Sequence, residues 1–291
     1  MGGDRPLRVA LQGELGSFSD EAIQQLWGSA AERLPYRDFA DVTAAVMSGA
    51  ADHGVLPTEN SIVGSISGSH DALIDAPSLH ALGETIVAVH HCLLAAPGTP
   101  FESVRSVFSH PVALAQCGRF FADHPQLEIS AVYDTAGAAM DVSRVNDPMI
   151  AAVASRRAAH RFGLEILRAD IEDRSDNQTR FLAIGQRPVE MPAGAAARTM
   201  MLIRTGDHPG DLLRALAPFA AHDLNMRRLE TRPTGQPWSY RFCIEFEHEA
   251  GDPAVDAAVR DIAAVTAESR LVGTYPRWIA GRPSGGVTIF T

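Results

Sequence analysis

A carboxylate, an amide and a hydroxyl stand at three successive positions, Glu59, Asn60 and Ser61, two residues after the apolar run 54–56. An ordinary turn after a strand needs only one such side chain, and such a turn is the alternative interpretation. A carboxylate can give or take a proton, and an amide beside a hydroxyl can hold a substrate carboxylate through hydrogen bonds. We therefore predict acid–base chemistry at Glu59 and substrate binding at Asn60 and Ser61.

The stretch 175–185 reads SDNQTRFLAIG and passes from short polar side chains into an apolar strand pattern. Thr179 and Arg180 stand at this junction. The hydroxyl of Thr179 can donate a hydrogen bond, and the guanidinium of Arg180 suits the planar recognition of a carboxylate. The junction is either the edge of an active site or a loop that enters a strand.

Two further polar segments also follow predicted strands. In the segment 13–19, glycines permit a tight turn, and Ser17 or Ser19 could cap the next helix and help to hold an anion. A segment that begins at Ser109 leads into a helix that carries Gln116. Helix capping alone would explain the serine, so this segment is a candidate site only together with the others.

Short apolar runs alternate with helical patterns from residue 7 to residue 186, which predicts an α/β domain. Open α/β sheets bind ligands beyond the carboxyl ends of their strands, where helix N-termini offer free N–H groups to anions. The polar segments fall at such positions. We predict strands at 7–11, 54–56, 104–108, 129–132 and 149–154, and helices at 20–26, 41–47, 111–121, 135–145 and 156–162.

A second domain is predicted after a linker at 187–197, which is rich in alanine and proline. The domain covers 198–278, and the tail 279–291 follows it. Its order of elements is βαββαβ, the ferredoxin-like arrangement. The elements are a strand at 199–204, a helix at 211–221, strands at 225–231 and 238–247, a helix at 253–268 and a strand at 271–275.

The composition narrows the classes of function. A net charge of −10 argues against a nucleic-acid partner, because binding phosphates requires clustered positive charge. All 25 basic residues are arginine, so the sequence offers no lysine for a Schiff base or a phosphate-binding loop. Arginine also suits carboxylate recognition.

The cysteines and the N-terminal sequence indicate a cytoplasmic protein without a membrane segment. Cys92, Cys117 and Cys243 are odd in number and far apart, which fits reduced thiols and argues against a zinc site. The first residues, 1–13, lack the long apolar segment of a secretion signal. We expect neither a metal nor a membrane partner.

The polar segments together resemble prephenate dehydratases, and the second domain resembles the ACT regulatory domain of these enzymes. The similarity covers roughly residues 7 to 278. It rests on the order of the segments 13–22, 54–61, 109–117, 134–136 and 177–181, and on 208–212 and 229–233 in the second domain.

The resemblance implies a two-lobed α/β fold similar to periplasmic binding proteins, with the site in the cleft between the lobes. It implies decarboxylating dehydration of prephenate to phenylpyruvate without a redox cofactor or a metal. Thr179 would hydrogen-bond the leaving hydroxyl, with Glu59 as the rival proton source. The residues implied to bind or orient the substrate are Ser17, Asn60, Ser61, Ser109, Gln116, Thr135, Arg180 and Phe181.

The resemblance also implies regulation by L-phenylalanine, bound between the ACT domains of a homodimer or homotetramer. Asp211 would either add a charge near the ligand ammonium or be an ordinary acidic residue of a first helical turn. An arogenate dehydratase and a non-catalytic small-molecule-binding protein are the alternatives. The implied effector-binding residues are Pro209, Gly210, Asp211, Leu212, Asn225, Glu230, Thr231 and Arg232.

Overall fold

The computed structural model describes residues 5–279 of the chain, and they group into two compact units. No helix within this range combines the length and the apolar character needed to cross a bilayer. The first unit contains the chain up to His70 and the segment Thr85–Phe181, and the second contains Asp71–Glu84 and the chain from Leu182 onward.

This division differs from the predicted domain boundary at residue 186. It falls within a strand, Gln178–Gly185, and it assigns the segment 71–84 to the second unit. A boundary inside a strand leaves no mark in composition, so the sequence pattern shows only the linker that follows. Apart from its first residue, the predicted tail 279–291 lies outside the described residues.

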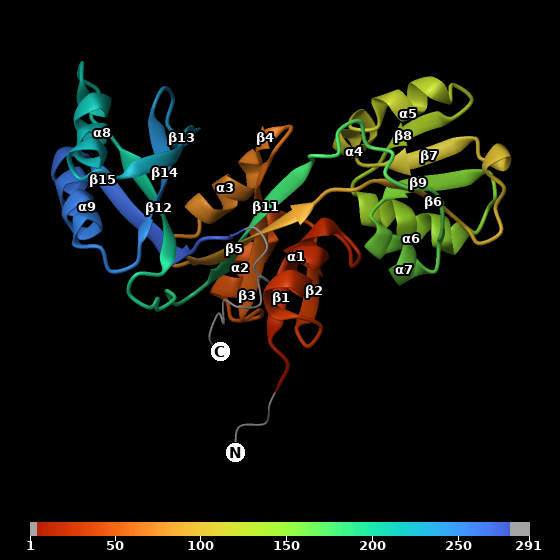
Figure 1. The fold of residues 1–291 in the computed structure, drawn as a ribbon, viewed down its shortest axis with the longest axis horizontal. Helices are drawn as coiled ribbons and strands as arrows, with labels where there is room; N and C mark the ends of the chain where they lie inside the picture. Colours follow the sequence, from red (N-terminus) through yellow and green to blue (C-terminus); the bar gives the residue numbers. More distant parts are fainter. Residues whose placement is uncertain (1–4, 280–291) are drawn as a thin grey trace. The chain divides into compact units, whose positions relative to one another are not determined.

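The first sheet has the strand order β2-β1-β3-β11-β5, and β4 pairs with β3 (Figure 1). Strand β1 runs parallel to both β2 and β3, so the carboxyl ends of these strands lie at one edge of the sheet. Its strands are β1 (Arg8–Gln12), β2 (Glu32–Tyr36), β3 (His53–Asn60), β4 (Gly64–Ser65), β5 (His80–Ala88) and β11 (Gln178–Gly185), and the helices nearby in sequence are α1 (Phe18–Trp27), α2 (Phe39–Met47) and α3 (Ser67–Ile74).

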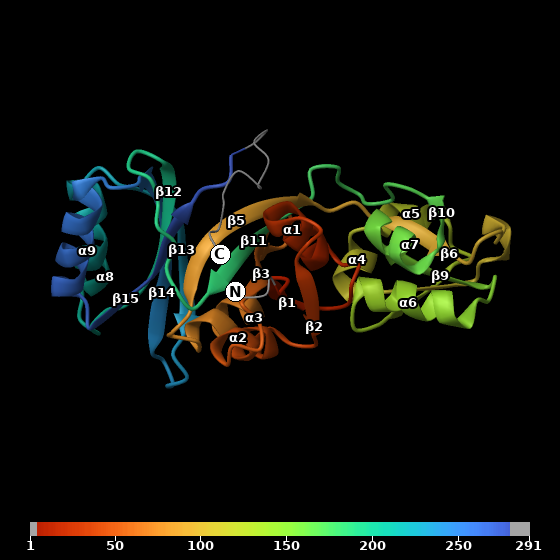
Figure 2. The same cartoon turned by 90° about the horizontal axis from the view of Figure 1, so that it is seen from below.

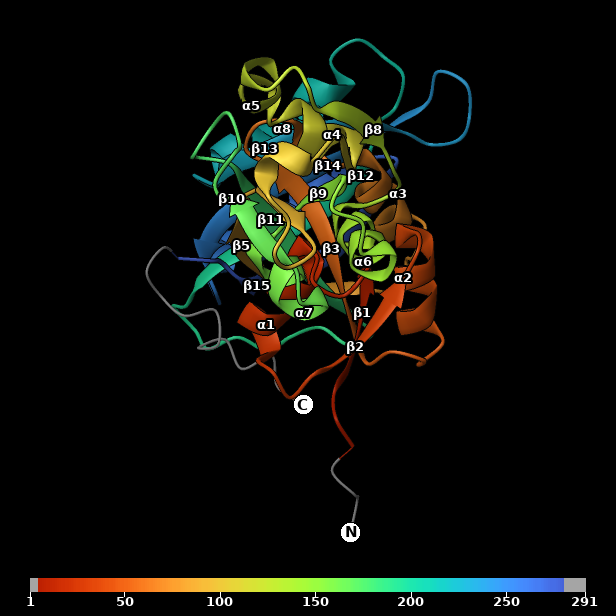
Figure 3. The same cartoon turned by 90° about the vertical axis from the view of Figure 1, so that its right-hand side faces the viewer.

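The second sheet has the order β10-β6-β9-β7-β8, and β7 runs parallel to β8 and β9. Helices α4 and α5 lie on one side of it and α6 and α7 on the other (Figure 3). Each side encloses its own apolar core. The elements are β6 (Cys92–Ala95), β7 (Ser106–Ser109), α4 (Pro111–Ala115), α5 (Gly118–Asp123), β8 (Glu128–Ala131), α6 (Thr135–Val145), β9 (Ile150–Ala154), α7 (Arg156–Phe162) and β10 (Glu165–Arg168), with a short 3₁₀ helix at Phe101–Ser103.

Direct contacts join these two lobes within the first unit. The hydroxyl of Ser155 donates to the carbonyl of Gly16 at 2.7 Å. Arg157 pairs with the buried carboxylate of Asp20, with Nε and Oδ2 2.8 Å apart. Gly16 approaches Ala158 so closely that a side-chain Cβ at this position would lie 3.0 Å from the Ala158 Cα. The close approach explains the need for glycine in this turn.

The second unit carries a four-stranded antiparallel sheet with the order β13-β14-β12-β15, and the predicted βαββαβ arrangement is confirmed. Helices α8 and α9 cover one face of this sheet (Figure 2). The apolar core lies between them and the sheet. The elements are β12 (Ala196–Arg204), α8 (Asp211–Ala221), β13 (Asn225–Pro233), β14 (Tyr240–Glu249), α9 (Pro253–Val265) and β15 (Glu268–Pro276).

The predicted helix 111–121 is wrong, because the structure divides it into α4 and α5. Cys117 has φ −112° and ψ 27°, which interrupts the helix. The carbonyl of the preceding Gln116 accepts a hydrogen bond from the backbone of Asp173 at 2.7 Å, and a carboxylate oxygen of Asp173 accepts one from the backbone of Arg119. A distant segment therefore ends α4 and begins α5.

Candidate active site

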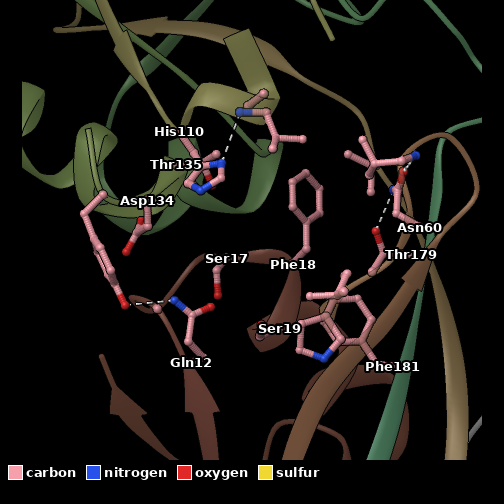
Figure 4. Close-up of a pocket in the computed structure, with 18 of the residues that line it drawn as sticks. Gln12, Ser17, Phe18, Ser19, Asn60, His110, Asp134, Thr135, Thr179 and Phe181 are labelled. Carbon is pink, nitrogen blue, oxygen red and sulfur yellow. Dashed lines mark hydrogen bonds between the residues drawn. The ribbon is translucent and has the colours of Figure 1, made fainter. Parts of the chain in front are cut away.

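A cavity of about 520 Å³ lies in the first unit, between its two lobes (Figure 4). The ends of β1, β3 and β11 reach it from the first lobe, and the N-termini of α1, α4 and α6 also line it. Parallel strands and the helices that follow them meet here, which is the expected ligand position in an α/β sheet. Of the predicted substrate-binding residues, Ser17, Asn60, Gln116, Thr135 and Phe181 line this pocket, as does Thr179.

The hydroxyl of Thr179 is oriented by Asn60, the last residue of β3. The amide oxygen of Asn60 accepts from the backbone N–H groups of Ile62 and Val63 at 3.0 and 3.1 Å, which fixes the orientation of the amide. Its NH₂ group therefore donates to the Thr179 Oγ1 at 3.0 Å. Because an amide NH₂ group can only donate, the Thr179 hydroxyl cannot give its proton to Asn60 and can donate it to a ligand in the pocket that Thr179 lines.

A chain of neutral side chains continues behind Asn60. Its NH₂ group also lies 2.8 Å from Asn177 Oδ1 and 3.1 Å from the Gln178 carbonyl, so its two hydrogens are shared among three acceptors. The Asn177 NH₂ donates to Gln116 Oε1 at 3.0 Å. The same Gln116 oxygen lies 2.9 Å from His91 Nε2. Because an amide oxygen can only accept, His91 Nε2 carries the proton. The Gln116 NH₂ group is then available to donate within the pocket.

His91 and Asn177 are functional candidates that the sequence patterns do not single out. His91 is buried and contacts Phe18, with ring centroids 5.8 Å apart in an edge-on arrangement. Burial lowers the pKa of His91, so the imidazole is neutral at pH 7. Asn177 is also buried, and its position within the motif 177–181 was the one signal that could have identified it.

Glu59 and Arg180 are not among the residues that line the pocket. Successive side chains of a strand point to opposite faces, so when Asn60 and Thr179 face the pocket their neighbours point away. Arg180 Nη2 lies 3.2 Å from Glu59 Oε2, and the two side chains interact with each other. The predicted acid–base role of Glu59 and the predicted substrate contact of Arg180 stay predictions, with both side chains outside the pocket lining.

Ser61 and Ser109 are also absent from the pocket lining, because their hydroxyls hold the backbone together. Ser61 Oγ donates to the carbonyl of Asp176 at 3.0 Å and accepts from the backbone of Gln178 at 2.9 Å. Ser109 is fully buried and donates to the carbonyl of Val153 at 2.6 Å. Each serine therefore positions a segment next to the pocket rather than a substrate.

Three helix N-termini present N–H groups to the pocket. Ser17 caps α1 by accepting from the backbone of Asp20. Asp134 caps α6 by accepting from the backbone of Gly137, and Thr135 is the first residue of that helix. The N-terminus of a helix carries partial positive charge and attracts anions. The pocket is thus suited to an anionic ligand.

His110 caps the third of these helices, α4. Its Nδ1 accepts from the backbone N–H of Val112 at 3.2 Å, so the ring proton of the neutral form lies on Nε2. Burial lowers the pKa of His110, and the nearby carboxylate of Asp134 acts in the opposite direction. His110 lines the pocket and is a further neutral hydrogen-bond donor at pH 7.

The group most suited to a metal ion in the described part of the chain is His90, Asp170 and Glu172. One ligand atom from each lies within 4.8 Å of the others. His90 Nδ1 already bonds Glu172 Oε1 at 2.7 Å, and Arg156 contacts both oxygens of Asp170 at 2.8 and 2.7 Å. The arrangement is that of an ion-pair network next to His91.

Comparison with known proteins agrees with this geometry. A family model described as prephenate dehydratase matches residues 9–189. The chain belongs to the prephenate dehydratase family. The predicted family and the predicted α/β fold, with its ferredoxin-like C-terminal part, are confirmed.

Three relatives of this prephenate dehydratase family member differ in their described activity. Arogenate dehydratase/prephenate dehydratase 2 of Arabidopsis thaliana, described as chloroplastic, is 36% identical over 280 residues, which are 93% of this chain and 73% of that protein. The structure of the Arthrobacter aurescens prephenate dehydratase in complex with L-Phe has 30% identity and a TM-score of 0.85, covering 93% and 90% of the two chains. A structure described as a novel type of quorum quenching acylase has 34% identity and a TM-score of 0.85, covering 94% and 100%.

The predicted effector residues of this family member form two groups in the second unit. In the first group, Gly210 has φ +87° and caps α8, a backbone conformation that favours glycine. Asp211 accepts from the backbone of His208 at 2.9 Å and pairs with Arg214, and these contacts lower the pKa of its carboxyl. Asp211 therefore closes its own loop, as an acidic residue of the first helical turn does. Pro209 and Leu212 flank this turn.

The second group lies on β13, where alternate residues face opposite sides of the sheet. Glu230 pairs with Arg228 at 2.5 Å, and Arg232 pairs with Asp71 at 2.5 Å. Leu229 lies on the other face, where its cross-strand neighbour belongs to the apolar core. The structure therefore separates Glu230 and Arg232 from the face that α8 covers. Asn225 and Thr231 are exposed on the same strand.

Proposed function

We propose that this protein is a prephenate dehydratase, which converts prephenate to phenylpyruvate by loss of water and carbon dioxide. The observation that carries the proposal is the Asn60 to Thr179 hydrogen bond of 3.0 Å. It leaves a hydroxyl donor fixed in a pocket whose helix N-termini suit an anion. Membership of the prephenate dehydratase family supports this reading.

Prephenate is a cyclohexadiene with two carboxylates and a ring hydroxyl. The bond between the ring and its carboxylate breaks, and the electron pair enters the ring as the hydroxyl leaves from the opposite carbon. The departing oxygen takes up one proton and becomes water, and the ring becomes aromatic. The barrier lies in the departure of a poor leaving group, so a hydrogen bond to that oxygen lowers it.

Thr179 donates that hydrogen bond. A threonine hydroxyl is too weak an acid to transfer its proton outright, so Thr179 acts by hydrogen bonding and the proton that completes the water comes from another group or from solvent. Preorganised donors of this kind contribute about 2.7–4 kcal/mol each to stabilisation of a transition state. Glu59 is not the proton source in this scheme, because its carboxylate pairs with Arg180 away from the pocket.

Neutral donors hold the dianion in place. Gln116, His110 and the first residues of α1 and α6 line the pocket, and the Gln116 NH₂ and the His110 Nε2–H are their neutral donors. Phe181 is buried beside them and offers an apolar surface to the ring. Holding the reacting groups in one geometry accounts for a large part of the rate enhancement in reactions of this type.

Arogenate dehydratase is the second candidate activity, because the Arabidopsis relative is named for both substrates. Arogenate differs from prephenate only in carrying an ammonium group in place of the keto oxygen. Asp38 lines the pocket and is exposed, so its carboxylate could receive that ammonium. We therefore expect measurable turnover of both substrates, with prephenate preferred.

The relative described as an acylase suggests amide cleavage, and the pocket offers little for it. Such chemistry needs a nucleophile beside a general base. His91 Nε2 bonds Gln116, and His110 Nδ1 accepts from Val112. Ser17 and Thr179 have no hydrogen bond to a histidine among the described residues. The site is thus arranged for hydrogen bonding to a leaving group rather than for acyl transfer.

The test is incubation of the purified protein with prephenate, with arogenate and with an N-acyl amino-acid amide, while phenylpyruvate, phenylalanine and free amine are measured separately. We expect rapid formation of phenylpyruvate from prephenate. Release of amine with no phenylpyruvate would overturn the proposal. The Thr179→Ala variant is the matched negative control, because it keeps the pocket and loses the donor.

We also propose that L-phenylalanine binds the second unit and inhibits a cytoplasmic homodimer or homotetramer. The related Arthrobacter aurescens structure contains L-Phe. Strand β13 is an edge strand and carries the exposed Leu229. The exposed Leu212 and Leu213 lie at the start of α8. An exposed edge beside apolar side chains favours pairing with a second copy. The ligand ring would lie against Leu212, near Gly210 and the partner's strand.

Calorimetric titration with phenylalanine tests the effector site. Leu212→Ala should weaken binding about 10-fold, as expected for loss of a large apolar contact. Leu271→Ala is the matched control, because Leu271 is an exposed leucine on β15, the opposite edge strand. Equal binding by Leu212→Ala and the parent protein would contradict the proposed location, and a monomer in solution would contradict the pairing.

A further inference from the structure

Gln12, Arg37 and Tyr133 meet at one end of the pocket and join the two lobes of the first unit. Gln12 Nε2 donates to Tyr133 Oη at 3.0 Å and to the carbonyl of Arg37 at 3.2 Å. The Cζ atom of Arg37 lies over the Tyr133 ring, 5.3 Å from its centroid. Gln12 ends β1 and Arg37 follows β2, whereas Tyr133 follows β8 of the other lobe. We refer to these three residues as the Tyr133 clamp.

Arg37 is the only arginine that lines the pocket within the described part of the chain. It is exposed and has no ion pair with any residue between 5 and 279. Arg180, the guanidinium that the sequence suggested for this task, pairs with Glu59 instead. Two carboxylates, Asp38 and Asp134, also line the pocket, so an anionic substrate needs the Arg37 charge in addition to the helix N-termini.

Stacking on an aromatic ring leaves a guanidinium able to bind a carboxylate. The Cζ atom of Arg37 lies 5.3 Å from the centroid of the Tyr133 ring, within the range of a cation–π interaction. This contact uses none of the guanidinium N–H groups as a hydrogen-bond donor to a carboxylate, so two of them can still form parallel hydrogen bonds to a ligand carboxylate. Gln12 donates to both the tyrosine hydroxyl and the backbone carbonyl of Arg37, so it holds the ring and the backbone from which the guanidinium extends.

The clamp lies across the pocket from the proposed leaving-group site. Figure 4 shows Gln12 on one side of the cavity and Thr179 with Asn60 on the other, with Ser17 and Phe18 between them. In prephenate the carbon that bears the hydroxyl is para to the carbon that bears the ring carboxylate and the pyruvyl side chain. A substrate with its hydroxyl at Thr179 therefore directs its carboxylates toward Arg37.

Building on the function proposed above, we propose that Arg37 binds the side-chain carboxylate of the substrate, the one that the product retains, and that Tyr133 and Gln12 position the guanidinium. The other carboxylate leaves as neutral carbon dioxide. An ion pair to that group would weaken as the bond breaks, and it would stabilise the ground state more than the transition state. An ion pair to the retained carboxylate carries no such cost.

Phenylpyruvate isolates this contact, because it carries only the retained carboxylate. Arg37→Gln should weaken phenylpyruvate binding in calorimetry about 10- to 100-fold and raise KM for prephenate similarly, with kcat within about 3-fold of the parent value. Arg37→Lys should recover part of the loss, and Tyr133→Phe should have a smaller effect. Arg119→Gln is the matched control, an exposed arginine on α5 that does not line the pocket.

The outcomes separate this inference from the proposed activity. If the parent protein turns over prephenate and Arg37→Gln binds phenylpyruvate as tightly as the parent does, the role of Arg37 is wrong and the activity stands. A fall in kcat without a change in KM would also overturn it, because it would place Arg37 at the leaving group. If the parent neither turns over prephenate nor binds phenylpyruvate, both proposals fail.

Discussion

The pocket of the first unit and the charged sheet face of the second unit are both networks of buried polar side chains, but they use opposite chemistry. Behind Thr179 the network consists of the neutral side chains of Asn60, Asn177, Gln116 and His91. On the sheet of the second unit, opposite the face that α8 and α9 cover, arginines alternate with glutamates.

Arg198 is the centre of the charged network. It reaches Glu84 at 3.0 Å, Glu247 at 2.7 Å and Glu245 at 3.7 Å. Glu247 also accepts from Arg227 at 2.9 Å and from Arg277 at 2.8 Å. Burial raises the pKa of Glu247, but the contacts with the arginines outweigh it and lower the pKa to about 2. Glu247 therefore stays ionised at neutral pH and pairs with three arginines.

The difference between the networks follows from the charges that surround each of them. A pocket for a dianion cannot place more carboxylates near the substrate without repelling it, and neutral amides orient a hydroxyl without adding charge. Buried charges, in contrast, are stable only when each one is paired and hydrogen-bonded. The neutral network should thus control the reaction rate, whereas the charged network should control stability and its dependence on pH.

The largest expected effect concerns the neutral network. Thr179→Ala should lower kcat about 100- to 1000-fold, because it removes the donor to the leaving hydroxyl. Thr179→Ser should retain part of the activity. Steady-state kinetics with prephenate measure the loss, and thermal unfolding should show a variant that remains folded. Turnover near the parental rate would exclude the assigned role, and unfolding without a specific kinetic defect would indicate a structural residue.

Asn60→Asp should lower kcat about 10- to 100-fold while preserving the shape of the side chain. A carboxylate at position 60 accepts the Thr179 proton, so the hydroxyl no longer donates to the substrate. The double variant with Thr179→Ala should be no slower than Thr179→Ala alone, because residues that act as a unit are not additive. Additive losses would show that Asn60 acts independently of Thr179.

Glu247→Gln should destabilise the protein at pH 7 by roughly 1–2 kcal/mol and leave kcat nearly unchanged. The folded-state pKa of about 2 lies below the ordinary value of 4.5, so ionised Glu247 contributes stability above pH 4.5 and loses it as the pH falls toward 2. The expected loss is modest because Glu247 is partly exposed, and solvent screens its charge. Denaturant unfolding of both proteins should give curves that converge near pH 2, and a constant difference would exclude this mechanism.

The smallest expected effect belongs to Glu59. Glu59→Gln should change kcat less than about 3-fold and leave its pH profile intact, because the carboxylate pairs with Arg180 outside the pocket. Such partly exposed ion pairs contribute about 0–1 kcal/mol to folding stability, so the variant should also remain folded. A profile of kcat against pH for both proteins is the measurement. Loss of an ionisation on the acidic side would restore Glu59 as the proton donor.

The pH profile of the parent protein adds a related test of the neutral network. The pKa values of His91 and His110 are both lowered by burial, so both rings are already deprotonated above pH 6.5. We expect kcat to change less than about 2-fold between pH 7 and pH 8.5. A histidine ionisation within this range would show that one of the rings is charged when the substrate binds.

The sequence by itself determined the elements with clear periodicity and clear end signals. Helix 135–145 was predicted with its observed limits, because Asp134 caps one end and Asn146 adopts a left-handed conformation at the other. The βαββαβ order of the second domain and the family also followed from local patterns. The sequence patterns do not predict the strand Glu32–Tyr36, because this edge strand has no buried residue and is defined by its backbone pairing with β1 rather than by an apolar pattern.

Only the tertiary structure decided which polar side chains face the pocket. Glu59 and Asn60 are neighbours on β3, and Thr179 and Arg180 are neighbours on β11. The sequence cannot tell which residue of each pair faces the pocket, because that depends on how the strands pair and on where the second lobe lies. The same holds for Arg37, whose guanidinium lies over the ring of Tyr133, a residue distant in sequence. Residue types and motifs are local properties, whereas the direction of a side chain and the charges around it depend on contacts between distant segments.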